Sequence, residues 1–187
     1  MKELTKQQWC IDQHRNTNHW YDQYLPYEFH LRMVVQAAKD FIHLIKDLDT
    51  DGEDINLTTE DIVLAAWAHD TIEDTRTSYN DVKSVLGESV ADIVYAVTND
   101  KGKNRKERAG EKYYTGIRNT PGAVFVKLCD RIANVQYSKM TKSRMFEMYK
   151  GENLEFTKSL GLRGDGVEYP GHEYYPMYQY LMNLFKD

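Results

Sequence analysis

The chain has 187 residues, a length that fits one domain and leaves little room for two complete ones. Hydrophobic residues make up 41% and charged residues 28%, which argues against a chain that is disordered throughout. The 24 Lys and Arg residues against 29 Asp and Glu residues give a formal charge of −5, which argues against a general nucleic-acid binder because such proteins need clustered positive charge. A small anionic ligand stays compatible with this charge, since one local pocket can carry the opposite sign.

Cysteine usage and hydropathy predict a cytoplasmic protein. Cys10 and Cys129 are too few for a disulfide framework, so we expect free thiols. The first residues, 1–8, lack the apolar stretch of a secretory signal. No run approaches the roughly 18 apolar residues of a membrane span. We therefore expect neither a membrane nor a nucleic acid as a partner.

The first half of the chain contains clear helix signals. Apolar residues recur at spacings of three and four between residues 31 and 45, which predicts a helix with one buried face. The polar segment 47–57 is expected to form a loop. Thr58, with Asp61 three positions later, predicts a capping box that opens a helix through the apolar residues 62–67.

Similar signals continue toward the C-terminus. Ser78 repeats the capping signal and predicts a short helix that ends near Gly87, followed by further helical spacing over residues 90–97. Pro121 is expected in the first turn of a helix whose apolar stripe runs over residues 124–135. Because strand-like alternation is weak throughout, the sequence predicts an all-α bundle.

The segment 164–187 differs from the rest, with two prolines and five tyrosines. We expect an irregular cap packed on the bundle, because the tyrosines offer a large apolar area to bury. Two roles stay open for this cap: closure over a pocket, or a homo-oligomer contact.

The densest cluster of reactive side chains lies between His69 and Asp74. The adjacent His69 and Asp70 offer an imidazole and a carboxylate, two ligand types that suit a divalent transition metal. They follow an apolar helix, where a buried charge is costly unless it is paired or metal-bound. The alternative is an ordinary solvated helix end, since adjacent His and Asp residues are common.

Asp130 and His30 are further candidate ligands with ordinary alternatives. Asp130 lies in an apolar segment and shares a helical face with Lys127 and Asn134. It is either a metal ligand or a carboxylate paired with a neighbouring cation on an amphipathic helix. His30 begins the first long helix, where it is either a ligand or a cap-region histidine.

The order of these candidates resembles the H…HD…D pattern of the HD phosphohydrolase superfamily. More narrowly, the sequence is similar to the RelA/SpoT-type alarmone hydrolases, and in particular to their compact single-domain forms. The similar segments come in the family's order over roughly residues 19–150. They are PYEFH (26–30), HDTIEDT (69–75), VTNDK (97–101) and KLCDRIAN (127–134), which resemble P-Y-x-x-H, HD-x-x-ED-T, V-T-D-D-K and K-L-A-D-R-L-x-N.

The resemblance implies both a fold and a chemistry. The fold would be an HD-domain helical bundle forming a single domain over 1–187, with its core at about 19–150 and the tyrosine-rich cap at about 164–187. The activity would be water attack that removes the 3′-pyrophosphate of a guanosine alarmone such as ppGpp. The implied metal ligands, for one Mn²⁺ ion, are His30, His69, Asp70 and Asp130. Glu73 and Asp74 would position or deprotonate the attacking water.

Substrate contacts follow the family less closely. The family has a basic pair eleven residues before the first metal histidine, where this sequence has His19 and Trp20. These two side chains could stack on a base, and Trp20 could equally fill the core. Asn134 matches the family's nucleoside-contacting Asn, with a plain helix-surface residue as the alternative.

Positive charge is concentrated at residues 101–112 of the sequence. This run is either a solvated loop or an electrostatic rim that attracts a polyphosphate. Lys101 within it, and Lys139 and Arg144 after the Asp130 helix, are candidate phosphate contacts.

The altered basic pair keeps two other functions open. One is an HD hydrolase that acts on another nucleotide or phosphoester. The other is a non-catalytic nucleotide-binding regulator. The presence of four ligand types together with Glu73 and Asp74 speaks against the regulator, because a pure binder has no need of them all.

Overall fold

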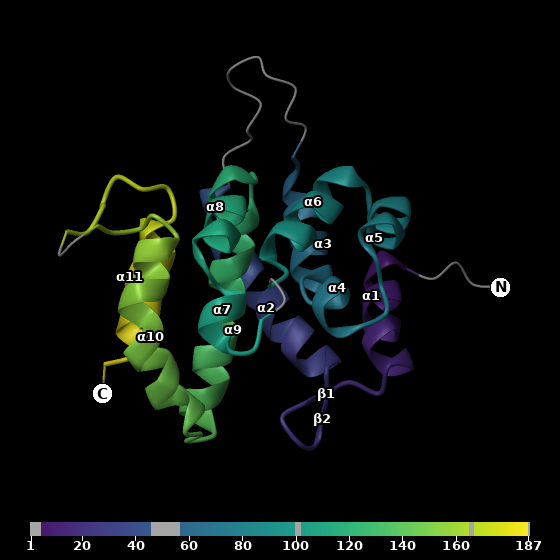
Figure 1. The fold of residues 1–187 in the computed structure, drawn as a ribbon, viewed down its shortest axis with the longest axis horizontal. Helices are drawn as coiled ribbons and strands as arrows, with labels where there is room; N and C mark the ends of the chain where they lie inside the picture. The colour runs from purple at the N-terminus through teal and green to yellow at the C-terminus, as the bar shows by residue number, and fades with distance from the viewer. Residues whose placement is uncertain (1–4, 46–56, 100–101, 165–166, 187) are drawn as a thin grey trace, which may run out of the picture.

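The computed structural model describes residues 5–45, 57–99, 102–164 and 167–186, and over these ranges the chain is almost entirely helical (Figure 1). One short antiparallel hairpin pairs Trp20 with Pro26. The elements, in chain order, are α1 Lys6–Asn16, β1 Trp20–Tyr21, β2 Leu25–Pro26, α2 Glu28–Phe41, the 3₁₀ turn Ile42–Leu44, α3 Thr59–Ala68, α4 Thr71–Asp74, α5 Tyr79–Leu86, α6 Glu88–Val97, α7 Arg105–Arg108, α8 Glu111–Asn119, α9 Ala123–Met140, α10 Met145–Ser159 and α11 Tyr175–Leu184. The expected all-α architecture is confirmed.

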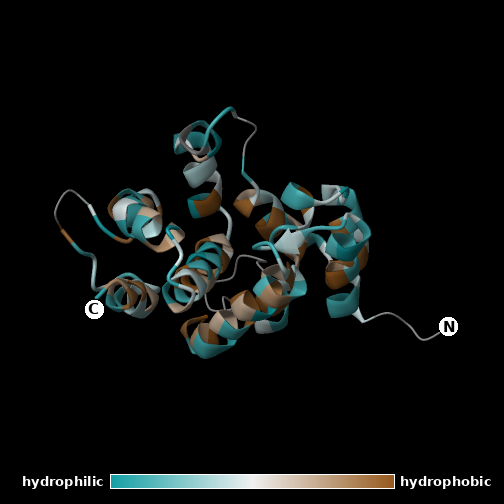
Figure 2. Ribbon diagram, turned by 90° about the horizontal axis from the view of Figure 1, so that it is seen from below, coloured by the Kyte–Doolittle hydropathy of each residue, from teal (hydrophilic) through white to brown (hydrophobic). Residues whose placement is uncertain are grey.

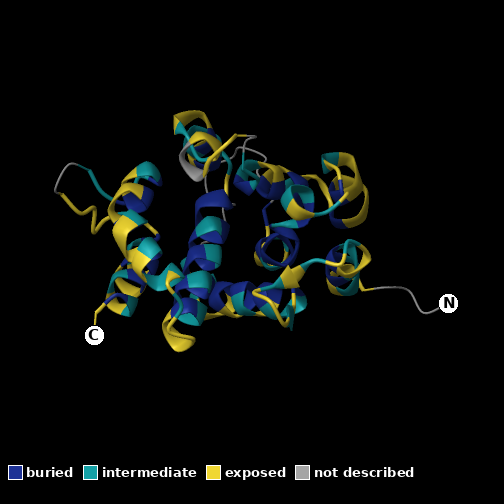
Figure 3. Cartoon of the chain, turned by 60° about the horizontal axis from the view of Figure 1, so that its bottom comes forward, coloured by how far each residue is buried: buried dark blue, intermediate teal, exposed yellow. Residues whose placement is uncertain are grey.

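Helix α9 is the centre of the bundle. It packs against α2, α3, α6, α8, α10 and α11. Its apolar stripe is buried, with Phe125, Leu128 and Ile132 almost completely removed from solvent. Figure 2 shows hydrophobic residues on the faces by which helices meet, and Figure 3 shows the same faces buried. Burial of this apolar surface is the main term that holds the helices together.

The predicted capping boxes are both present. The side chains of Thr58 and Asp61 bond each other's backbone N–H groups at the start of α3, and Ser78 and Asp81 do the same for α5. Helix α5 also ends where predicted, because Gly87 has a positive φ of 107° that terminates the helix. The expected loop at 47–57 falls almost wholly outside the described residues.

The two cysteines are free and fully buried, as the thiol count predicted. Burial raises the pKa of the Cys10 thiol to about 12 and that of the Cys129 thiol well above its ordinary value. Both side chains are therefore neutral packing groups. Among the described residues, no helix is both long and apolar enough to cross a membrane.

Two local predictions are wrong. Pro121 lies in the turn before α9 rather than in its first turn, because Gly122 takes a left-handed conformation (φ 80°) and the helix starts at Ala123. The described part of the segment 164–187 packs on the bundle as expected, but 175–184 is helix α11 rather than an irregular cap. Met177, Tyr178 and Leu181 share a helical spacing that buries them against the core.

Replacement of Gly122 and of Gly151 by alanine should have opposite effects on the free energy of unfolding. At Gly122 a Cβ would combine left-handed strain with close contact to the Ile62 side chain, so Gly122→Ala should lower the free energy of unfolding by about 1–2 kcal/mol. Gly151 lies inside α10 with open space around it, so Gly151→Ala should raise that energy by about 0.5–1 kcal/mol. Urea unfolding of both variants measures the difference. Equal effects would contradict the conformation assigned to Gly122.

Candidate functional site

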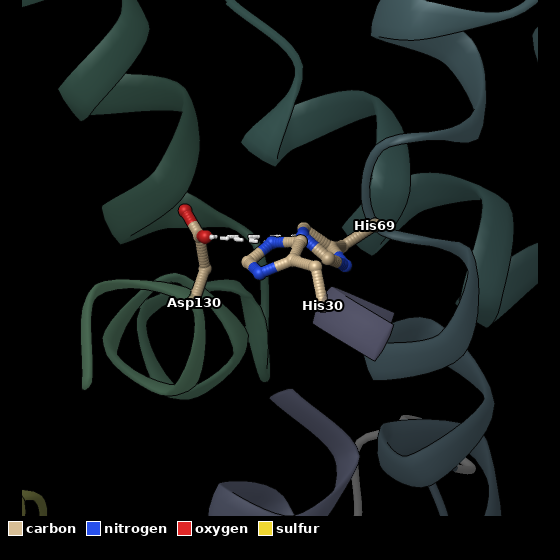
Figure 4. Close-up of side chains that lie close together, drawn as sticks. All are labelled: His30, His69 and Asp130. Carbon is tan, nitrogen blue, oxygen red and sulfur yellow. Dashed lines mark hydrogen bonds and ion pairs between the residues drawn. The ribbon is translucent and has the colours of Figure 1, made fainter. Parts of the chain in front are cut away.

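Three helices bring three of the candidate ligands together in the interior. His30 lies in the first turn of α2, His69 follows the last residue of α3, and Asp130 lies within α9. The Nε2 atoms of the two histidines are 3.2 Å apart. Asp130 Oδ1 is 3.4 Å from His30 Nε2 and 3.8 Å from His69 Nε2. Figure 4 shows the carboxylate and the two rings pointing toward one another from opposite sides.

The fourth candidate, Asp70, joins the same cluster. Its Oδ2 atom lies 2.8 Å from His69 Nε2 and 3.6 Å from His30 Nε2. The structure therefore gathers all four residues that the sequence selected as ligands. His69 is buried, which argues against the solvated helix end as its role, and His30 is buried in the first turn of α2 with its Nε2 atom facing the cluster.

Opposite charges stabilise the cluster. Burial alone would lower the pKa of His30, but its hydrogen bonds with Asp130 and Asp70 raise it to about 9. Burial would likewise raise the pKa of Asp70, but the His69 charge and the hydrogen bonds of both histidines hold it well below its usual range. The carboxylates are thus ionised and face a positive charge.

The donor set fits a divalent transition-metal ion. Imidazole nitrogen and carboxylate oxygen are the ligand types that such ions take in proteins. His69 Nδ1 donates to the carbonyl oxygen of Ala66 at 2.9 Å, so Nε2 is the nitrogen that faces the cluster and that, once deprotonated, offers a lone pair to a metal ion. Backbone contacts of this kind commonly fix the orientation of metal-ligating histidines.

Asp130 is held in place from two sides. The Lys127 ammonium lies 3.1 Å from Oδ2, and Asn134 Nδ2 donates to Oδ1 at 2.5 Å. Burial alone would raise the pKa of Asp130, but the charge of Lys127 and the hydrogen bond with His30 lower it below the usual range. Asn134 in turn accepts a hydrogen bond from the Tyr21 hydroxyl at 3.0 Å. The ion pair expected of an ordinary amphipathic helix is present, and Asp130 belongs to the cluster as well.

Glu73 is fixed by the start of the segment after α6. Its Oε2 accepts from the Asn99 backbone N–H at 3.0 Å, and the Asn99 side-chain amide donates to both carboxylate oxygens at 2.8 and 3.0 Å. Asn99 stands where the similar family segment has Asp, so an amide donor replaces a carboxylate here. The segment was noted in the sequence, but the role of Asn99 was missed.

Asp74 lies in an aromatic and acidic environment. The Tyr27 hydroxyl bonds to Asp70 and lies 3.4 Å from Asp74 Oδ2. Burial and the neighbouring carboxylates of Asp70 and Glu73 raise the pKa of Asp74 to about 7. The His19 ring stacks on Tyr27 at 4.0 Å, and its Nε2 is 4.0 Å from Asp74 Oδ2.

Tyr21 and Tyr27 are site residues that the sequence analysis missed. The Tyr21 ring stacks on His30, with ring centroids 4.8 Å apart. Tyr27 was quoted in the PYEFH segment, yet nothing local to the sequence indicates that it reaches two carboxylates on another element. The hydroxyl of Tyr21 bonds to Asn134 and that of Tyr27 reaches Asp70 and Asp74, so these contacts join positions far apart in the sequence and only the folded chain reveals them.

The cluster opens into a cavity of about 940 Å³ between α2, α4, α8, α9 and α10. Of the predicted residues, six line it: His30, Asp70, Glu73, Asp74, Asp130 and Asn134. Arg108, from the basic run, lines it too, and this part of the run is the short helix α7 rather than a loop. Lining residues that the sequence analysis missed include Tyr27, Asn99, Tyr113, Tyr114, Tyr149 and Phe156.

Several predicted substrate contacts lie elsewhere. Lys139 Nζ donates to the carbonyl oxygens of Leu184 and Lys186 at the end of α11, and Arg144 immediately precedes α10; neither lines the cavity. Trp20 is 51% exposed on β1, so it does not fill the core, and it does not line the cavity either. Lys101 falls outside the described residues.

Comparison with known proteins gives a consistent set of likenesses. No protein-family model matches the chain. The guanosine-3′,5′-bis(diphosphate) 3′-pyrophosphohydrolase MESH1 of Danio rerio is 32% identical over 127 residues, which are 68% of this chain and 63% of that protein. The guanosine-3′,5′-bis(diphosphate) 3′-pyrophosphohydrolase of Aquifex aeolicus is 38% identical over 104 residues, 54% of this chain and 15% of that protein. The chain thus spans less than two thirds of these relatives.

A solved structure extends the likeness to the whole fold. It is described as a metazoan ortholog of SpoT that hydrolyses ppGpp, and its TM-score with this chain is 0.65 at 20% identity. The superposition covers 99% of this chain and 96% of the other. The predicted HD-type helical fold is therefore confirmed.

Metal binding should depend on the cluster and not on Glu73. His69→Ala or Asp130→Ala removes a donor from the four-residue set, so either should abolish the visible absorption that Co²⁺ gains when it binds nitrogen and oxygen ligands. Glu73→Ala should keep that absorption, because Glu73 bonds to Asn99 and not to the cluster. Titration of the purified variants with Co²⁺ measures this. Loss of Co²⁺ binding in Glu73→Ala alone would contradict the assignment of ligands.

Proposed function

We propose that this chain, which belongs to the SpoT-like HD hydrolases, removes the 3′-pyrophosphate of a guanosine alarmone such as ppGpp. The observation that supports this proposal most directly is the joint position of the histidine–aspartate cluster and the Glu73 carboxylate at one end of a cavity of nucleotide size. The named activity of the curated relatives points to the same substrate.

We assign the metal to His30, His69, Asp70 and Asp130, and we propose Mn²⁺ as the ion. A bound divalent ion supplies Lewis acidity, which lowers the pKa of a water molecule and stabilises negative charge on a phosphoryl oxygen. Tyr21, Asn134 and Lys127 keep the ligands in place through their contacts with His30 and Asp130. Such supporting contacts matter because a ligand that swings away loses much of its affinity.

Glu73 and Asp74 handle the proton of the attacking water in this proposal. Asn99 fixes both oxygens of Glu73, so the carboxylate meets the water in one orientation rather than several. A carboxylate in hydrogen-bond reach of water can orient it and accept its proton as the phosphorus–oxygen bond forms. Asp74, whose Oδ2 lies 3.4 Å from the Tyr27 hydroxyl, is the second carboxylate at this position.

Direct attack by water agrees with the state of the thiols. Cys10 and Cys129 are buried, and their raised pKa values keep them neutral, so neither thiol serves as a nucleophile. Arg108 lines the cavity and supplies positive charge for the phosphates.

Product analysis tests the proposed substrate. The purified protein with Mn²⁺ should convert ppGpp to GDP and pyrophosphate, and anion-exchange chromatography of the reaction mixture detects these products. Other guanosine, adenosine and uridine phosphates are tested in parallel as alternative substrates. Turnover of those alone would favour an HD hydrolase with another substrate. Binding of nucleotide without any turnover would instead favour a regulator and contradict hydrolysis.

The role of Glu73 predicts a loss of turnover with the metal retained. Glu73→Ala should lower kcat by about 10²–10⁴-fold, the usual range for loss of a positioned acid or base, while Mn²⁺ binding is kept. Glu60→Ala is the matched control, since Glu60 is an exposed glutamate in the first turn of α3 and is not among the residues that line the cavity. Steady-state rates and Mn²⁺ titration measure the two effects. A normal rate in Glu73→Ala would overturn the role given to this carboxylate.

A further inference from the structure

A second cavity lies between α6 and α8, which pack against each other. Its volume is about 630 Å³. Both helices line it with polar or aromatic side chains, namely Ser89, Asp92 and Tyr95 from α6 and Lys112 and Asn119 from α8. None of these five residues takes part in the proposed hydrolysis. The proposed activity therefore leaves this cavity without a role.

Small residues keep the α6–α8 cavity open. Ala96 and Gly116 line it from the two helices, and a Cβ at Gly116 would meet no atom within 4 Å. A glycine inside a helix weakens that helix. No neighbouring side chain or backbone needs the space at Gly116, so close packing does not account for the glycine. Gly116 thus lowers helix stability and leaves volume that a ligand can fill.

Asn99 and Tyr113 form a wall between the α6–α8 cavity and the cavity that holds the cluster, since both residues line both cavities. Tyr113 is buried, and its hydroxyl donates to the carbonyl oxygen of Val97 at 2.8 Å, which ties α8 to the end of α6. Lys127, which lines only the cluster's cavity, has its Nζ 5.9 Å from the Tyr113 ring centroid. The two cavities are therefore separate spaces that share one wall.

Asn99 connects this wall to the carboxylate of Glu73. Its backbone N–H and its side-chain amide bond to the two Glu73 oxygens at 2.8–3.0 Å. An acceptor bound in the α6–α8 cavity would compete with Glu73 for the side-chain amide, while the backbone N–H kept its bond to Oε2. Glu73 would then lose its single orientation and still remain at the site.

The lining of the α6–α8 cavity suits a sugar phosphate. Asp92 accepts a hydrogen bond from the Tyr79 hydroxyl at 2.7 Å, and its carboxylate has further acceptor sites for sugar hydroxyls. The side chains of Ser89 and Asn119 make no hydrogen bond within the described part of the chain, so both are available to a polar ligand. The Tyr95 ring is 64% exposed and offers a flat apolar surface.

Lys112 supplies the positive charge for the phosphate group. Because Lys112 directly precedes Tyr113, its charge lies beside the shared wall. A phosphate bound there brings several acceptor oxygens close to Asn99. The sugar then extends along α6 toward Asp92.

We propose that the α6–α8 cavity binds a sugar phosphate and that this ligand slows the proposed hydrolysis by drawing the Asn99 amide away from Glu73. The ligand is a free sugar phosphate or the sugar-phosphate part of a nucleotide. The effect on rate rests on the proposed function, whereas the binding does not.

Calorimetry with ribose 5-phosphate and with AMP tests the binding. Gly116→Leu places a side chain in the ligand's volume and should weaken binding about tenfold or more. Gly151→Leu is the matched control, since it makes the same exchange inside α10, also into open space and outside both cavities. Lys112→Ala should also weaken binding, because it removes the charge that pairs with the phosphate.

The two probes distinguish the sources of the ligand. Binding of both indicates a free sugar phosphate, and binding of AMP alone indicates a nucleotide. If neither probe bound saturably, or if Gly116→Leu bound as well as the unaltered protein, the site would be overturned.

Steady-state kinetics with ppGpp test the coupling to Glu73. The bound probe should lower kcat about fivefold or more, the lower range of coupling between two sites, with KM nearly unchanged because the substrate's own cavity stays open. Gly116→Leu should lose this response and Gly151→Leu should keep it. A probe that raised KM alone would be bound in the substrate's cavity, which contradicts the proposal.

A readout independent of turnover separates this inference from the proposed hydrolysis. The side-chain amide resonance of Asn99, assigned by its loss in Asn99→Asp, should shift when the probe binds. An unmoved resonance would overturn the coupling. Binding that depends on Gly116 and shifts this resonance, in a protein that does not turn over ppGpp, would instead contradict only the proposed hydrolysis.

Discussion

The burial of two imidazoles and two carboxylates at one point constrains the rest of this structure. Taking charges out of water is costly unless opposite charges and hydrogen bonds replace the water. His30, His69 and Asp130 come from three helices, so α2, α3 and α9 have to approach closely for the charges to meet. The alanines of α3, fully or almost fully buried, permit this approach because they add little bulk between the helix axes. The apolar core thus stabilises a polar centre that could not form by itself.

Local signals made much of this architecture predictable. Capping boxes at Thr58 and Ser78 fix helix starts within a few residues, and three-and-four spacing identifies buried faces without any knowledge of neighbours. Helix α1, by contrast, is mostly polar and buries few side chains, so its periodicity is weak. The hairpin 20–26 has two-residue strands, too short for an alternating pattern. The tyrosines of 164–187 suggested burial correctly, but their aromatic composition concealed the helical spacing of α11.

The site also contains some residues that the sequence reveals and others that only the folded structure reveals. The residues of its cluster were predictable because an ordered set of segments resembles a family pattern, and such a pattern is a property of the sequence itself. The side chains that hold those ligands act across the fold. Tyr21 reaches Asn134 and Asn99 reaches Glu73 over long sequence separations, and no local pattern encodes these distances. Lys139 illustrates the converse error: positive charge near the site suggested a phosphate contact, whereas the ammonium bonds to the last carbonyls of α11.

A net charge of −5 describes the chain and not its cavity. Part of the negative charge lies in Asp70 and Asp130, which histidines and Lys127 neutralise in the interior. Tyr27 then joins the two proposed halves of the site, because its hydroxyl bonds to Asp70 among the candidate ligands and approaches Asp74 among the carboxylates proposed to handle water. A displacement of this ring would therefore disturb both groups together. The two groups also have separate supports, since Lys127 contacts Asp130 and Asn99 contacts Glu73, so Tyr27 links positions that are otherwise held independently.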